Sequence, residues 1–191
     1  MKKVYYVNND YEVKTMDELR ESWQDEIDSE IIDHDTSLQA WIDTNNWEPV
    51  SNDDVLAIAD ILDLNTDEIA EVLEKIESED DTDFVVSGAR IIHKDFIDKI
   101  QQDELCSDLY ILGCFNASFL AEYLPISRQA IEAIQKADAY EALGEIVQEY
   151  IEEIQAGYAA ADGYGHHFNG YDFSEEETDH YYIFPRAGGI R

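Results

Sequence analysis

The sequence has very little positive charge. Of its 191 residues only 12 are Lys or Arg, against 45 Asp and Glu, and the formal net charge is −33. Neither residues 21–74 nor residues 137–185 contain a single Lys or Arg. Such charge repels anionic membrane surfaces and opposes compaction of the chain itself. It therefore needs an explanation beyond solubility.

Cysteine, proline, glycine and long apolar runs are also scarce. Two cysteines, Cys106 and Cys114, do not make the disulfide framework of a secreted protein, so we expect two reduced, largely buried thiols. The N-terminus lacks the apolar run of a signal peptide, and no stretch reaches the roughly 18 apolar residues of a membrane span. We expect a cytoplasmic protein, in the host cytoplasm if a phage encodes it, with no membrane partner.

Apolar residues, in contrast, are plentiful. Hydrophobic residues make up 45% of the chain and aromatic residues 12%. Disordered acidic segments are poor in both classes, so this composition excludes an unstructured acidic tail. The sequence predicts a folded core with an acidic surface.

The first half of the chain reads as mainly helical. Residues 4–7 are β-prone and precede a turn at residues 8–10. Thr15 and Glu18 have the spacing of a capping box and open a first acidic helix, and residues 37–42 predict a short one. Asn52 or Asp53, and then Asn65 or Thr66, cap two further helices. The charged loop at residues 77–83 is the expected domain boundary.

The second half mixes both element types. We expect strands at residues 84–86 and 90–92, and helices at 94–102, 117–124 and 127–155, the last divisible at Gly144. Residues 109–112 predict a buried element of either type. An Asn-Gly dipeptide at Asn169 predicts a type I′ hairpin between aromatic segments, before a last strand at residues 180–184.

These elements define an α+β fold, mainly helical, with capped helical hairpins, short antiparallel strands and a C-terminal β-hairpin. The predicted division is an acidic N-terminal helical half, residues 1–80, and a C-terminal α+β half, residues 81–191, ending in an aromatic hairpin. The helical hairpins near Ile58 and Leu120 share a pattern at an offset of 62 residues. Duplication and chance both remain open as its origin.

The helical hairpins do not have the surface of a DNA-binding helix-turn-helix. Such a motif surrounds its recognition helix with Lys and Arg contacts to phosphate. The second helix of the first hairpin would instead present Asp67, Glu68, Glu71 and Glu74 to the DNA backbone. We therefore expect no direct binding to nucleic acid.

No motif for catalysis or for a cofactor is present. The chain has no phosphate-binding loop, dinucleotide fingerprint or nucleophile elbow. His166, His167, Asp172 and His180 cluster in the tail, but adjacent histidines on a strand point to opposite faces. Aromatic packing in a hairpin accounts for them better than a metal site. We expect no enzyme, no metal and no cofactor.

The acidic residues recur in a pattern that resembles the spacing of DNA phosphates. Carboxylates at i and i+4 of a helix lie about 6 Å apart, similar to neighbouring phosphates, although they destabilise an isolated helix by a few tenths of a kcal/mol per pair. The chain keeps many such pairs without interleaved Lys. This indicates that the negative electrostatic field has a function of its own. A basic groove would bind this surface with counterion release, as it binds DNA.

In charge and size the chain resembles the acidic DNA-mimic inhibitors that phages and mobile elements make against restriction enzymes, CRISPR nucleases and other DNA-binding proteins. These proteins share no motif, so the resemblance assigns no residue a role. The tail segment 162–172 and the run Tyr181-Tyr182-Ile183-Phe184 are similar to the ends of uncharacterised phage proteins. The resemblance implies an inhibitor that occupies the DNA groove of a host nuclease or defence complex.

Two strips of carboxylates are the predicted partner-binding residues, each standing in for a phosphate. The first strip is Glu21, Asp25, Asp28, Asp33, Asp35, Asp60, Asp67, Glu71 and Glu74, and the second is Glu145, Glu149, Glu152 and Glu153. A homodimer would double the length of DNA duplex that the surface imitates, and the oligomeric state is left open.

Two further roles for the acidity stay open. An acidic interaction module or adaptor would bind a basic partner without competing with DNA. Salt adaptation would use the carboxylates to maintain hydration in brine, but the chain keeps many large aliphatic residues, which halophilic proteins tend to lose. A mimic displaces its partner from DNA, whereas an adaptor leaves the partner bound to DNA. A halophilic protein unfolds in low salt, which neither a mimic nor an adaptor needs to do.

Overall fold

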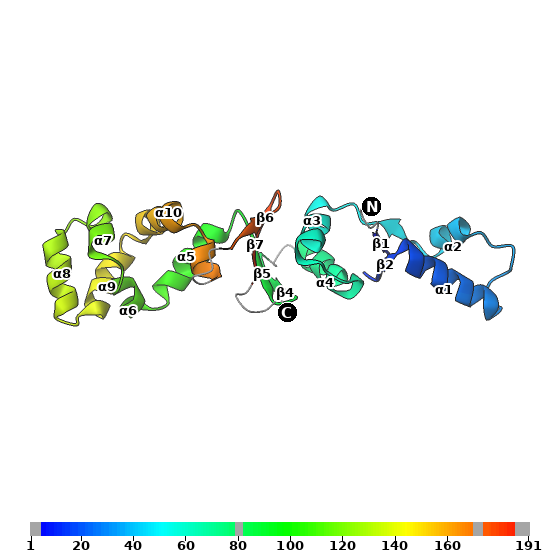
Figure 1. Ribbon diagram of the computed structural model, residues 1–191, viewed down its shortest axis with the longest axis horizontal. Coiled ribbons are helices and arrows are strands. Elements are labelled where there is room, and N and C mark those ends of the chain that lie inside the picture. The colour runs from blue at the N-terminus through cyan, green and yellow to red at the C-terminus, as the bar shows by residue number, and fades with distance from the viewer. Residues whose placement is uncertain (1–4, 79–81, 170–173, 186–191) are drawn as a thin grey trace. The chain divides into compact units, whose positions relative to one another are not determined.

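The computed structural model describes residues 5–78, 82–169 and 174–185. The chain forms two compact units, the first made of Met1–Ile91 with Glu176–Arg191 and the second of Ile92–Glu175. The α+β class is confirmed: most elements are helices, with small sheets and a hairpin near the C-terminus (Figure 1). Each unit buries apolar side chains of its own.

The first unit begins with a three-stranded sheet beside two helices. Its elements are β1 (Tyr5–Val7), β2 (Val13–Thr15), α1 (Met16–Asp28), α2 (Leu38–Thr44) and β3 (Glu48–Pro49). The strand order is β2-β1-β3, with both pairings antiparallel. The predicted capping box opens α1, since Thr15 accepts from the N–H of Glu18 while the Glu18 carboxylate accepts from the N–H of Thr15. Leu19, Trp41 and Trp47 are buried in the core beneath.

The rest of the first unit packs a helical hairpin against a four-stranded sheet. The hairpin is α3 (Asp53–Leu62) and α4 (Thr66–Glu77), capped by Asn52 and Asn65. The sheet order is β4-β5-β7-β6, made of β4 (Asp83–Val86), β5 (Ala89–His93), β6 (Glu176–Glu177) and β7 (Tyr181–Pro185). Ile58, Ile69 and Ile91 are fully buried in their shared core.

The second unit is helical throughout the part of it that the structure describes beyond β5. Its elements are α5 (Ile97–Cys106), α6 (Leu109–Gly113), α7 (Ala117–Tyr123), α8 (Arg128–Lys136), α9 (Tyr140–Gln148), α10 (Ile151–Asp162) and α11 (Gly165–Phe168). Leu112, Leu120, Ile131 and Leu143 have no exposed surface and form its core.

Residues 127–155 are not one helix. Asp138 has a left-handed φ of 58°, and it separates α8 from α9; a second break separates α9 from α10. Gly144, the expected division, instead lies inside α9, where α6 crosses it. A Cβ on Gly144 would lie 1.9 Å from the carbonyl oxygen of Leu109, so only glycine permits this approach.

The C-terminal hairpin is present, but its turn is not at Asn169. It pairs Glu177 with Tyr182 and turns at residues 178–180. The first arm of the predicted aromatic hairpin is helical, as α11, and residues 170–173 of that prediction lie outside the described residues. The last strand was predicted correctly.

The structure also differs from the sequence predictions at the cysteines and at the domain boundary. Cys114 is exposed and Cys106 half-buried, so the thiols are free but not largely buried. The chain divides after Ile91, whereas the sequence placed the boundary near residue 80. The reason is packing: Phe84 and Val86 of β4 are buried in the same core as α3 and α4, so these strands belong to the first unit.

Candidate functional site

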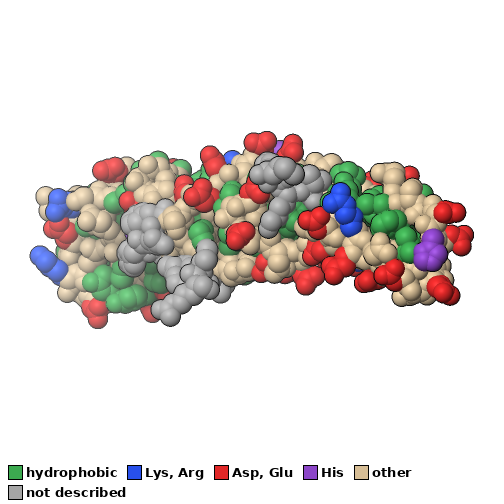
Figure 2. All heavy atoms as spheres, turned by 45° about the vertical axis from the view of Figure 1, so that its right-hand side comes forward, with side chains coloured by type: hydrophobic (Ala, Val, Ile, Leu, Met, Phe, Trp, Pro, Cys, Tyr) green, Lys and Arg blue, Asp and Glu red, His purple; other side chains and the backbone are tan. Residues whose placement is uncertain are grey.

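Helices α1 and α4 each present a row of carboxylates to solvent. Glu21, Asp25 and Asp28 lie at i, i+4 and i+7 of α1, and Asp67, Glu71 and Glu74 repeat this spacing on α4. The opposite sides of these helices bury apolar residues, so the acidic rows face outward. All thirteen residues of the two predicted strips are exposed. In the space-filling view, red carboxylates are spread over the visible face of the molecule, with few blue cations among them (Figure 2).

The two acidic helices meet at a shallow cavity. Strand β2 contacts both α1 and α4, and beside it lies a hollow of about 310 Å³. Glu21 and Asp25 of α1 line this hollow together with Asp67 of α4. Tertiary structure therefore brings together carboxylates that are more than 40 residues apart in sequence. We call these three residues, with Glu71, the α1–α4 acidic surface.

A second hollow adjoins the first and extends the negative charge. It has a volume of about 450 Å³ and shares Glu12, Lys14, Ser22 and Asp25 with the first. Its further lining includes the acidic side chains Asp10 and Glu26. Carboxylates of the β1–β2 turn, of α1 and of α4 thus line two adjoining hollows, which we together call the acidic depression.

Lys14 lines both hollows of this depression, and its charge is already compensated. Its ammonium lies 2.9 Å from a Glu12 carboxylate oxygen and 3.2 Å from the hydroxyl of Ser22. It also lies 5.3 Å from the ring centre of Trp47, within the range of a cation–π contact. A half-buried lysine held by three groups adds little positive potential to the surface around it.

Tyr11 responds to the negative field at the far end of α4. Its hydroxyl donates a 2.5 Å hydrogen bond to Glu77. This bond, with the charges of Glu77 and Glu74, raises the pKa of Tyr11 above its usual value of 10.0. Ionised Tyr11 would place another negative charge beside these carboxylates, and their repulsion favours the neutral hydroxyl.

The structure does not bring every predicted residue to this depression. Asp33 and Asp35 follow α1 in a loop, and Asp60 lies on α3. Asp28 lies on α1, and Glu71 and Glu74 lie on α4. None of these six residues lines either hollow. The second strip belongs to the second unit, where Glu145 lies on α9, Glu149 is the C-cap of α9, and Glu152 and Glu153 lie on α10. The two strips are therefore separate candidate surfaces.

Sequence reasoning missed four carboxylates that contribute to the depression: Asp10, Glu12, Glu18 and Glu26. A signal was present, because the predicted turn at residues 8–10 places Asp10 and Glu12 at the end of a hairpin. What the sequence lacked was the contact of that hairpin with α1 and α4. The position of Glu26 also depends on a tertiary contact, because its carboxylate accepts a hydrogen bond from the indole of Trp41 at 2.8 Å.

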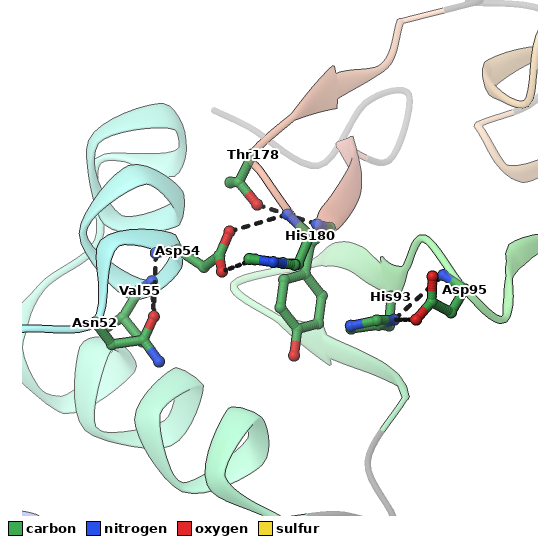
Figure 3. A network of polar contacts seen from close by, with 8 residues as sticks. Asn52, Asp54, Val55, His93, Asp95, Thr178 and His180 are labelled. Atoms are coloured by element: carbon green, nitrogen blue, oxygen red, sulfur yellow. Dashed lines mark hydrogen bonds and ion pairs between the residues drawn. The ribbon is translucent and has the colours of Figure 1, made fainter.

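The tail histidines are divided between the two units. His180 pairs with Asp54 in the first unit, while His166 and His167 lie on α11 in the second (Figure 3 shows the first pair). His166 and His167 pack edge-on against Tyr158, on a helix rather than in the expected hairpin. Among the described residues, no three His, Cys, Asp or Glu side chains are grouped so that they could hold a metal ion.

No family model, curated protein or solved structure matches the chain. In the described part of the chain, none of the helices has the length and apolar character needed to cross a membrane. Any inference about function therefore rests on the surface itself.

Proposed function

We propose that the protein is a DNA-mimic inhibitor, which occupies the DNA-binding groove of a host nuclease or other defence protein of the restriction or CRISPR type. One observation carries the proposal: carboxylates from β1–β2, α1 and α4 line two adjoining hollows, and Lys14, which lines both, is already paired with Glu12. The protein would act in the cytoplasm, without catalysis or cofactor.

Physical chemistry supports a basic groove as the partner. Exposed carboxylates at i and i+4 repel one another, so the surface has a standing electrostatic cost in the free protein. A groove lined by Lys and Arg removes this repulsion and releases condensed ions from both surfaces. Association would be fast and strongly dependent on salt, because opposite fields steer the encounter.

Competition with DNA is the decisive experiment. The full chain serves as bait in a lysate of the host at about 100 mM salt, where fields still act over about 10 Å. Excess duplex DNA is then added to the captured material. We expect a DNA-binding protein to be captured and then released by DNA. Capture that survives DNA would support the adaptor alternative, and capture of no basic protein would overturn both.

A matched pair of variants locates the surface. The first carries Glu21→Lys, Asp25→Lys, Asp67→Lys and Glu71→Lys; the control carries Glu145→Lys, Glu149→Lys, Glu152→Lys and Glu153→Lys. Both sets change four exposed carboxylates, and each includes a position in the first turn of a helix. We expect the first set to abolish capture and the second to retain it. Equal losses would mean that net charge, rather than the α1–α4 acidic surface, mediates binding.

A further inference from the structure

The second unit contains a cavity that the acidic surface does not involve. Its volume is about 540 Å³, within the range of about 300–1,000 Å³ typical of small-molecule sites. Residues from α5, α6, α7, α10 and α11 line it, together with the short segments between α5 and α7 (Figure 1 labels most of these helices). The space is far larger than one amino-acid side chain would fill.

Aromatic rings form one wall of the cavity. The ring centres of Phe119 and Phe115 are 5.8 Å apart, and that of Tyr158 lies 5.4 Å from Phe115 in an edge-to-face arrangement. His166 and His167 continue the series, 5.7 Å and 6.3 Å from Tyr158. Each ring is held by its neighbours, so the wall is formed before any ligand arrives.

Carboxylates supply the charge on the cavity lining. Glu104, Asp108 and Asp162 all line the space, and none of the described residues that line it is Lys or Arg. Glu104 lies 3.0 Å from Nε2 of His167, and Asp108 accepts from two N–H groups at the start of α6. Asp162, at the exposed end of α10, is the carboxylate best placed to turn toward a ligand.

We propose that this cavity binds a small organic cation with an apolar, preferably aromatic, body. Aromatic faces attract cations through their quadrupoles, and the attraction strengthens as water is excluded. Carboxylates at the same site add a Coulomb attraction, whereas an anion would meet repulsion from them and from the net charge of the chain. The size of the space favours a free small molecule over one Lys or Arg side chain of a partner.

The test compares tryptamine with tryptophol, which has nearly the same shape but is neutral. Binding is followed by NMR titration of the full chain at about 0.15 M salt, where diffuse attraction between exposed charges is largely screened. We expect tryptamine to bind at least about 10-fold more tightly than tryptophol, with shifts on α10 and α11. Equal affinities, or no binding of tryptamine at millimolar concentration, would overturn the proposal.

Two variants separate the cavity from the general negative field. Asp162→Asn should weaken tryptamine binding about 5-fold or more and leave tryptophol unchanged, because it removes only charge. Glu153→Gln, on the same helix but outside the cavity lining, should leave the affinities for tryptamine and for tryptophol unchanged. Phe119→Leu should weaken tryptamine more than tryptophol, since it keeps an apolar side chain but removes a ring face. Identical effects of Asp162→Asn and Glu153→Gln would show diffuse attraction only and reject the site.

Cys114 gives an independent readout, because it is exposed and lines the cavity whereas Cys106 does not line it. Bound tryptamine should slow the reaction of Cys114 with a neutral maleimide several-fold and leave Cys106 unaffected. Unchanged reactivity at saturating tryptamine would contradict binding in this cavity. Neither experiment involves a protein partner, so the result is independent of the proposed inhibition.

Discussion

Asp54 and His180, 126 residues apart in the chain, are joined by two contacts. One carboxylate oxygen of Asp54 accepts from the N–H of His180 at 3.2 Å, and the other lies 2.8 Å from its Nδ1 (Figure 3). Thr178 adds a hydrogen bond to the same carboxylate. These contacts attach the turn of the C-terminal hairpin to the first turn of α3. Asp54 is thus a tertiary link within the first unit.

Replacing Asp54 by Asn should lower the free energy of unfolding by about 1–3 kcal/mol at pH 7, because the carboxylate accepts hydrogen bonds in a partly buried position. Burial by itself would raise the pKa of Asp54, but the hydrogen bonds from Thr178 and His180 outweigh it and lower the pKa below 3.8. The ionised group therefore stabilises the fold above the unfolded-state pKa, and this contribution is lost as pH falls through the folded-state pKa.

Urea unfolding between about pH 7 and pH 2 measures this effect. The difference between the wild type and Asp54→Asn should be largest above about pH 5 and shrink toward low pH. Asp53→Asn is the control, since Asp53 is the exposed neighbour in the same helical turn. A difference that does not change with pH, or an equal effect of the control, would contradict the link.

Gly144→Ala should destabilise the second unit by about 3 kcal/mol or more, because the added Cβ meets backbone atoms of α6 that cannot move aside locally. Gly113→Ala should do the same, with the Tyr140 carbonyl oxygen 2.0 Å from the new Cβ. Thermal unfolding followed by circular dichroism measures both. Glu141→Ala, exposed on α9, is the matched control and should stay near the wild type; a stable Gly144→Ala variant would rule out the close crossing.

Single neutralisations on the α1–α4 acidic surface should have little effect on partner binding. An exposed ion pair contributes about 0–1 kcal/mol, so Glu71→Gln should weaken binding by less than about 5-fold. The four-residue reversal should weaken it at least about 100-fold and flatten the dependence of affinity on salt. Anisotropy titrations of the captured partner from about 50 to 300 mM salt measure both. Loss of binding from Glu71→Gln alone would indicate a localised hot spot rather than distributed charge.

Salt should stabilise the protein only up to moderate concentration. The Debye length falls from about 30 Å at 0.01 M to about 8 Å at 0.15 M, which screens most repulsion between exposed carboxylates. We expect a folded protein at 0.01 M salt, a rise in Tm to about 0.15 M, and little change beyond about 1 M. The four-residue reversal of the α1–α4 acidic surface should show a smaller rise. Unfolding at 0.01 M salt would instead favour salt adaptation.

The starts of the helices with side-chain caps were predictable because their signals are local, whereas α9, α10 and α11 have no such cap and their starts were not predicted. Thr15 with Glu18, and Asn65 with Glu68, form capping boxes from residues three apart in the sequence. The ends of helices were harder to predict. Residues 137–139 carry no strong breaker in the sequence, yet the chain turns there, with Asp138 at positive φ. Gln135 donates to the carbonyls of Gly113 and Phe115 at 2.9 Å, which secures the end of α8 against α6. That contact spans at least 20 residues, beyond the reach of local propensity.

The sequence by itself determined the α+β class, the capped helices and the thirteen exposed carboxylates, because charge, capping and hydrophobic periodicity act over a few residues. Tertiary structure alone decided which carboxylates share a surface: Asp67 joins Glu21 and Asp25 because β2 contacts both α1 and α4. It also gathered Phe119, Tyr158 and His166 around one cavity. Such groupings depend on how buried faces fit together across long sequence separations, which local patterns do not encode.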